Sequence, residues 1–150
     1  MKGTSFIDDT CTPYVLCGHA FSKGKMHELA NYRFDRNGDS FIASINIFSK
    51  YQRRGIGYEI FRRGYCHFNS QTPIVRFVAN WSVSDEYMHL PNSCSTNLSV
   101  FRAQRANGID VIQSLWTTPT GKWLRRLGFL GAKIVKETNF DVQAEFCKRQ

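Results

Sequence analysis

The stretch that most constrains this chain is Tyr51-Gln52-Arg53-Arg54-Gly55-Ile56-Gly57. It lies between an apolar run, Phe41 to Phe48, and a run with helical spacing, Tyr58 to Phe68. A strand that leads through a basic, glycine-containing loop straight into a helix directs backbone N–H groups and the positive end of the helix dipole at one point. The two glycines permit close approach of the backbone to a bulky anion, and two arginines add full positive charges. The stretch therefore predicts a phosphate-binding site.

Two common phosphate-binding motifs are excluded. The dinucleotide fingerprint requires a third glycine where Ile60 stands, and the P-loop requires Gly-Lys followed by Ser or Thr. Gly121-Lys122 is followed by Trp123, so that match is fortuitous. An ordinary α/β domain with a glycine at a helix start remains the alternative interpretation.

The loop resembles motif A of the GNAT superfamily of N-acetyltransferases, in which Q/R-x-x-G-x-G/A cradles the pyrophosphate of acetyl-CoA. A second landmark follows later, because Leu127-Gly128-Phe129 resembles the end of the family's late helix. A strand from Ile74 to Asn80 is expected between the two landmarks, and a last strand from Ala132 to Lys136 after them. The landmarks occur in the order that is typical of the family.

The resemblance implies an α/β (α+β) fold with a mixed, mostly antiparallel central sheet, a splayed parallel strand pair and helices on both faces. A chain of 150 residues is expected to form a single domain, residues 1–150. About fifty residues precede the loop, fewer than is usual in the family. We expect the long insertion at 82–117 to cover the acceptor cleft instead.

Acetyl-CoA is the cofactor that the resemblance implies. In the family, backbone groups of one splayed strand meet the thioester and the loop holds the pyrophosphate. Carried over by position, the predicted cofactor-binding residues are Ile45, Asn46, Ile47, Gln52, Arg53, Arg54, Gly55, Ile56, Gly57, Tyr58 and Asn80.

The general acid and base are not evident from the family pattern. Many members place a tyrosine in the late helix, where this chain has Leu124, next to Trp123. Substitutes for the acid are Tyr65 and the insertion residues Tyr87, His89 and Cys94, and candidates for the base are Asp85, Glu86 and His89. We therefore predict that Asp85, Glu86, Tyr87 and His89 are catalytic. A solvated acidic pair and a packing histidine are the structural alternatives.

The cysteine pattern favours reduced thiols in a cytoplasmic protein. The five cysteines are odd in number and lack Cys-x-x-Cys spacing, which argues against a disulfide framework or a zinc ribbon. Cys11, Cys17 and His19 lack an evident fourth ligand, so no metal site is predicted. The sequence contains neither an apolar stretch of membrane-spanning length nor an apolar segment typical of a signal peptide.

The formal net charge of +8 favours a polyanionic partner, although the cofactor's phosphates can use part of that surplus. Arg62 and Arg63 are expected to join Arg53 and Arg54 near the loop. Deprotonating a lysine at neutral pH costs about 4 to 5 kcal/mol, and an α-amine only about 1 kcal/mol. Without an obvious base, the acceptor is expected to be a weakly basic amine.

The α-amine of an aminoacyl-tRNA is weakly basic and is carried by a polyanion, and some GNAT toxins use it as their acceptor. The resemblance then leaves open a homodimer and an antitoxin or immunity partner. Two other interpretations stand beside it: an inactive GNAT-fold module that binds nucleic acid, and an acetyltransferase for small-molecule amines.

Local patterns predict several elements. Asn37-Gly38 favours a tight hairpin before the strand Phe41 to Phe48, whose two apolar faces indicate cover on both sides. The next helix should bury a stripe through Gly64, with Arg62 and Arg63 facing away. Thr118-Pro119 is typical of a helix start.

Overall fold

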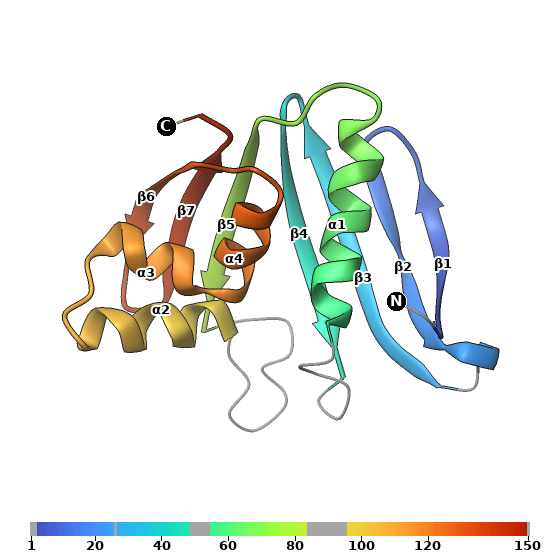
Figure 1. The fold of residues 1–150 in the computed structure, drawn as a ribbon, viewed down its shortest axis with the longest axis horizontal. Coiled ribbons are helices and arrows are strands. Elements are labelled where there is room, and N and C mark those ends of the chain that lie inside the picture. Colours follow the sequence, from blue (N-terminus) through green and yellow to red (C-terminus); the bar gives the residue numbers. More distant parts are fainter. Residues whose placement is uncertain (1–2, 26, 49–54, 84–95, 150) are drawn as a thin grey trace. The chain divides into compact units, whose positions relative to one another are not determined.

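The computed structural model describes residues 3–25, 27–48, 55–83 and 96–149. Contacts divide the chain into two compact units, residues 1–74 and 75–150. The first unit contains the strands β1 to β4 and the helix α1, and the second contains β5 to β7 and the helices α2 to α4 (Figure 1). None of the described helices combines the length and the apolar character that crossing a bilayer requires.

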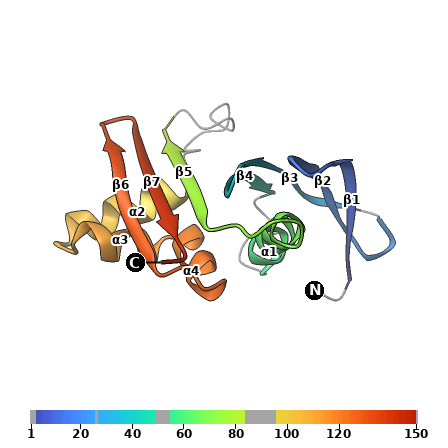
Figure 2. The ribbon, with the colours of Figure 1, turned by 90° about the horizontal axis from the view of Figure 1, so that it is seen from above.

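The first unit is an antiparallel meander with one long helix. Its elements are β1 (Thr4–Cys11), β2 (Val15–Ser22), the short 3-10 turn η1 (Lys23–Lys25), β3 (Glu28–Asn37), β4 (Ser40–Ile47) and α1 (Ile56–Asn69). Each strand pairs antiparallel with the next. Figure 2 shows α1 lying along one face of these strands.

The hairpin between β3 and β4 confirms the turn prediction. Asn37 pairs with Ser40, so the loop consists of Gly38 and Asp39. Gly38 has a φ of 63°, a left-handed conformation that tight hairpin turns require and that glycine adopts without steric cost. The predicted cover on both faces of β4 is wrong for part of the strand, because Ile42 is 47% exposed.

The core of the first unit is aromatic and is built around Gly64. The helix buries the predicted stripe, including Ile60, Phe61 and Phe68. A Cβ placed on Gly64 would lie 2.5 Å from the ring of Phe34, which is itself fully buried. Since a real Cβ does not approach that closely, only glycine lets α1 pack directly onto β3.

The orientation predicted for Arg63 is wrong. Instead of facing away, its guanidinium donates to both carboxylate oxygens of Asp8 on β1, at 3.0 and 2.9 Å, and to the Tyr32 hydroxyl at 3.2 Å. It also lies 4.6 Å from the centre of the Phe6 ring. Arg63 therefore ties the edge strand β1 to α1, and Asp8 neutralises its charge.

The second unit has three strands and three short helices. Its elements are β5 (Arg76–Ser82), α2 (Thr96–Ala106), α3 (Val111–Thr117), α4 (Pro119–Arg126), β6 (Gly131–Glu137) and β7 (Asp141–Cys147). β7 pairs antiparallel with both β5 and β6. The predicted last strand is therefore β6, and a further strand, β7, follows it.

In the second unit, alternate residues of β5 and β7 are buried in the core. Phe77, Trp81 and Phe146 are buried, and the Trp116 ring of α3 meets Phe146 edge to face at 5.2 Å. The period of two is the expected signature of strands with one covered face. Leu124 of α4 and Phe129 after it are fully buried as well.

The pairing of Asp8 with Arg63 makes a prediction for acid stability. The Arg63 guanidinium holds the pKa of Asp8 below its usual value of 3.8, and the Tyr32 hydroxyl lowers it further. A carboxyl group with a lowered folded-state pKa contributes stability above its unfolded pKa and loses that contribution as the pH falls through the folded value. Asp8→Asn should reduce the free energy of unfolding by about 1 to 3 kcal/mol at about pH 7, with a smaller difference at about pH 3.

Urea unfolding at both pH values measures this difference. Glu137→Gln is the matched control, because it removes the same charge at an exposed position of β6 and should leave stability nearly unchanged. A loss for Asp8→Asn that is the same at both pH values would contradict an ionic origin.

Candidate functional site

The start of α1 has the backbone geometry of an anion-binding site. Gly55 is the N-cap residue and has a φ of 79°, in the left-handed region that favours glycine. The first intrahelical bond runs from the Glu59 N–H to the Gly55 carbonyl, at 3.2 Å. An α-helix leaves its first N–H groups without intrahelical partners, and no side chain of the described residues caps them at Gly55. A ligand anion can supply that acceptor.

The starts of α3 and α4 are built differently. Asp110 caps α3, and its carboxylate accepts from the Gln113 N–H at 2.9 Å. Thr118 caps α4, where its hydroxyl oxygen accepts from the Gly121 N–H at 3.0 Å. The Asn97 side chain accepts from the Thr120 N–H at 2.9 Å. Of the helix starts α1, α3 and α4, only α1 begins without an internal side-chain acceptor.

The structure describes the predicted phosphate-binding loop only from Gly55 onward. Gln52, Arg53 and Arg54 lie outside the described residues, so their roles stay predictions. Ile56 and Gly57 are buried in the first turn of α1, and Tyr58 is half-buried in the same turn. The structure thus brings the described half of the motif together at one helix end.

The predicted strand residues lie at the ends of β4 and β5. Ile45, Asn46 and Ile47 form the last three residues of β4 and pair with Tyr32, Asn31 and Ala30 of β3. All three are half-buried, and the chain reaches the motif soon after them. Asn80 is exposed on β5 and pairs with Gln143 of β7.

The four predicted catalytic residues, Asp85, Glu86, Tyr87 and His89, lie outside the described residues. Among the described residues, the position of the family's tyrosine is occupied by Leu124, which is fully buried. Tyr65, a substitute considered for the acid, is 6% exposed and its ring lies 6.0 Å from that of Phe41. Both side chains are therefore core residues, and the identity of the acid stays a prediction within the insertion.

Arg62 is paired with an acidic side chain, so it adds less positive charge near the start of α1 than was expected. Its guanidinium donates to the Glu59 carboxylate at 3.0 Å, one turn earlier on α1. This hydrogen bond lowers the pKa of Glu59 and raises that of Arg62. The pair lies on the exposed side of the helix, where such an interaction is worth little to stability.

His19 is held by two carboxylates. Its Nδ1 hydrogen-bonds the Glu28 carboxylate, and its Nε2 lies 2.9 Å from Asp9. The hydrogen bond to Glu28 raises the pKa of His19. A Cβ on the neighbouring Gly18 would lie 2.2 Å from the Ile7 carbonyl oxygen, so this glycine serves close packing of β1 and β2.

Comparisons with known proteins identify the fold. No family model matches the sequence, and no curated protein matches it. The PaiA N-acetyltransferase from Thermoplasma acidophilum, solved in complex with coenzyme A, matches with a TM-score of 0.52 and 10% identity. That match covers 88% of this chain and 60% of PaiA.

Two further solved structures match less well. The GNAT domain of S. lividans PAT has a TM-score of 0.49 and 16% identity, over 89% of this chain and 60% of that one. A chimera of the spermidine N-acetyltransferase SpeG from Vibrio cholerae and hSSAT has a TM-score of 0.49 and 10% identity, over 93% and 68%. The chain thus spans 60 to 68% of the lengths of these three structures.

The chain has the fold of the GNAT N-acetyltransferases, so the predicted fold class is confirmed. The likeness to PaiA concerns the fold and extends over most of this chain. Among the three described helix starts, those of α1, α3 and α4, the one that the sequence marks with Gly55 and Gly57 has no side-chain cap.

Proposed function

We propose that this protein is an acyl-CoA-dependent N-acetyltransferase, which transfers an acetyl group from acetyl-CoA to an amine. The observation that supports it is the start of α1, where a left-handed glycine replaces a capping side chain. The first-turn N–H groups and the helix dipole favour a negatively charged group at this end. Gly55, Ile56, Gly57 and Tyr58 would hold the pyrophosphate of the cofactor through their backbone, with Gln52, Arg53 and Arg54 of the preceding loop.

The space beside Gly55 supports the proposal of a bound diphosphate. Gly55 offers no Cβ, and an added one would meet no atom within 4 Å, so the space beside the cap is open. The helix that follows has 14 residues and is fixed to its sheet through Gly64 and Arg63. A fixed helix presents its N-terminal dipoles without reorganisation, which is what tight anion binding requires.

Acetyl-CoA would supply an activated acyl group as its thioester. The residues proposed to orient it are Ile45, Asn46 and Ile47 at the end of β4, together with Asn80 on β5. Attack requires an uncharged amine, and the departing thiolate requires a proton. We propose Asp85, Glu86, Tyr87 and His89 for these proton transfers, because the described core offers Leu124 where a tyrosine is usual.

A weakly basic α-amine is the acceptor that we favour. The described part of α4 provides no phenol, and an α-amine costs about 1 kcal/mol to deprotonate at neutral pH, against about 4 to 5 kcal/mol for a lysine. The basic surplus of +8 further favours an acceptor carried by a nucleic acid, such as an aminoacyl-tRNA. A toxin role, with an antitoxin or immunity partner, would follow from that acceptor.

Isothermal calorimetry with acetyl-CoA tests the cofactor site. Gly57→Asp should reduce the affinity at least about 100-fold, because it adds a carboxylate where the phosphate charge would lie. Gly57 is buried, so the added carboxylate also carries a desolvation cost that can destabilise the fold. Circular dichroism checks the folded state of the variant.

Two further variants complete this test. Gly38→Asp makes the same substitution in a turn with no atom within 4 Å of the added Cβ, and should keep wild-type affinity. Arg54→Glu reverses a loop charge without changing the helix, and should weaken binding if Gly57→Asp fails to fold. Unchanged affinity in both Arg54→Glu and a folded Gly57→Asp would refute the cofactor assignment.

Acceptor choice is tested by following transfer of a radiolabelled acetyl group. We expect labelling of aminoacyl-tRNA and of free α-amines, with at least about 10-fold slower labelling of lysine peptides whose N-terminus is blocked. Uncharged tRNA is the control and should remain unlabelled. Preferential labelling of lysine peptides or polyamines would show that the acceptor assignment is wrong.

A further inference from the structure

The second unit contains a solvent-open hollow between α2 and α4. Its volume is about 480 Å³, within the usual range for a small-molecule or nucleotide site. Its lining residues are Val100 and Gln104 of α2, Thr117 of α3, and Pro119, Lys122 and Trp123 of α4. All of them belong to the insertion or to the late helix.

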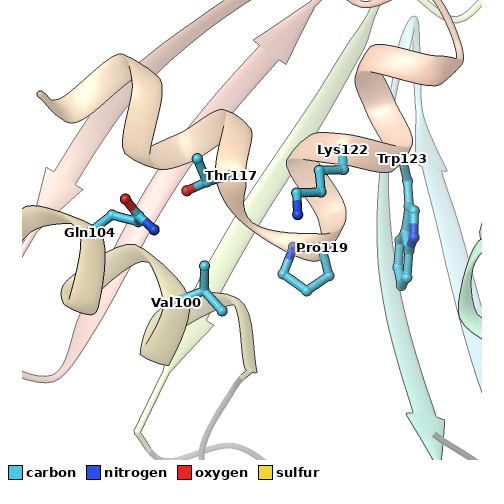
Figure 3. A pocket seen from close by; sticks show the side chains of 6 residues that line it. All are labelled: Val100, Gln104, Thr117, Pro119, Lys122 and Trp123. Carbon is cyan, nitrogen blue, oxygen red and sulfur yellow. The ribbon is translucent and has the colours of Figure 1, made fainter. Parts of the chain in front are cut away.

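Three polar groups converge on this hollow. Figure 3 shows the Lys122 ammonium, the Thr117 hydroxyl and the Gln104 carboxamide directed toward the space above Val100 and Pro119. Thr117 donates its own proton to the Ser114 carbonyl at 2.8 Å, so its oxygen can accept from a ligand. Within the described part of the chain, the Lys122 ammonium and the Gln104 carboxamide have no hydrogen-bond partner. Such an arrangement suits a ligand with an anionic group and a nearby hydroxyl.

The helix start beside the hollow does not compete for that anion. The Thr118 hydroxyl and the Asn97 carboxamide already accept from the N–H groups of Gly121 and Thr120. An anion in the hollow would therefore be held by the Lys122 side chain and by the charge around it. This differs from the proposed site at α1, which relies on backbone N–H groups.

The segment that provides the walls of the hollow is basic in sequence. Residues 75–150 contain ten Lys or Arg and six Asp or Glu, and segment 96–126 accounts for all of that excess. Its charged residues are Arg102, Arg105, Asp110, Lys122, Arg125 and Arg126. Outside this segment, the second unit has equal numbers of basic and acidic residues.

Among the described residues, three of these arginines have neutral partners. Arg102 donates to the Asn139 carbonyl at 2.7 Å, and Arg105 donates to the Ile109 carbonyl at 2.9 Å. The Arg125 guanidinium lies 4.0 Å from the centre of the Trp116 ring. Carbonyl and aromatic partners fix a guanidinium in place and leave its field available to a polyanion.

We infer that this hollow and the surrounding basic helices α2 and α4 bind single-stranded nucleic acid. Lys122 contacts a backbone phosphate, Gln104 and Thr117 hydrogen-bond the adjoining sugar or phosphate, and an unpaired base stacks on Trp123. A basic groove with an aromatic platform is the usual chemistry of such binding, and stacking requires an unpaired base. The inference deepens the proposed function, because it rests on a nucleic-acid-borne acceptor and assigns the surface that holds its carrier.

Fluorescence anisotropy with labelled RNA and DNA oligonucleotides of about 12 nucleotides tests the site at several salt concentrations. Lys122→Glu should weaken binding about 10-fold or more and reduce the slope of log K against log salt by at least about 1. Lys122 lies in the first turns of α4, where a carboxylate is compatible with the helix dipole. Gln104→Ala, on the opposite wall, should weaken binding about 3-fold through loss of a neutral hydrogen bond.

Lys136→Glu is the matched control, since it makes the same charge change at an exposed position of β6, outside segment 96–126. It should change the affinity less than about 3-fold. Equal losses for Lys122→Glu and Lys136→Glu would overturn the site in favour of diffuse charge attraction. Absence of oligonucleotide binding to the wild-type protein would overturn it outright. Displacement of the oligonucleotide by equimolar inorganic phosphate would show a small-anion site instead.

The transferase proposal and the nucleic-acid-binding proposal can be tested independently. Acetyl-CoA affinity, measured by calorimetry on the same proteins, should be the same in Lys122→Glu and in the wild type. If oligonucleotide binding fails while acetyl-CoA binds, the transferase proposal stands without this surface. If acetyl-CoA fails to bind while the oligonucleotide binds through Lys122, the surface stands without the transferase.

Discussion

The absence of a capping side chain at the start of α1 is the feature on which the functional account depends. A helix start needs acceptors for its first N–H groups, and α3 and α4 take theirs from Asp110, Thr118 and Asn97. At α1 the cap residue is Gly55, which has no side chain to contribute. No side chain of the described residues takes that role at α1, which is why we propose a ligand anion there.

The role proposed for that helix end requires that α1 be held firmly. Gly64 brings the helix onto the buried ring of Phe34, closer than any other residue would permit. Asp8 and Arg63 join the same helix to the edge strand β1 through two hydrogen bonds of 2.9 and 3.0 Å. Burial and the Asp8 carboxylate raise the pKa of Tyr32, which keeps its hydroxyl protonated as the donor to Asp8. Packing in the core thus fixes the direction of the helix dipole.

Local sequence signals predicted the elements whose stability is local. The tight turn at Gly38, the buried stripe of α1 and the Thr118-Pro119 start of α4 are all confirmed. Each depends on turn chemistry, capping or a period of 3.6 within about a dozen residues. The GNAT fold itself followed from two short motifs and their order, and is confirmed by the comparison with PaiA.

Elements that depend on distant partners were missed. β1 is an edge strand with mostly exposed or half-buried residues, so it lacks the alternation that marks a strand. α3 has seven residues, too few to show a helical period. Arg63 was expected to face away because its partner, Asp8, is 55 residues distant in sequence. No local pattern contains that pairing.

Of the candidate site, the helix start at Gly55 was predictable from the sequence, and the roles of its residues stay predictions. The motif at 52–58 marked the helix start directly, because its glycines permit close approach of the backbone to an anion and its arginines add positive charge. The hollow beside Lys122 had no such signal, because its walls come from α2 and α4 and meet only in the folded second unit. Its charge could have been noticed in the sequence, as segment 96–126 contains one acidic residue among five basic ones.

Amide chemical shifts recorded during a titration with acetyl-CoA test the central claim most directly. We predict that the amide resonances of Ile56, Gly57 and Tyr58 shift, since these N–H groups would donate to the diphosphate. The amides of Ile112 and Gln113, at the capped start of α3, should stay in place. Shifts that spare the first turn of α1, or that are as large at the start of α3, would contradict the account.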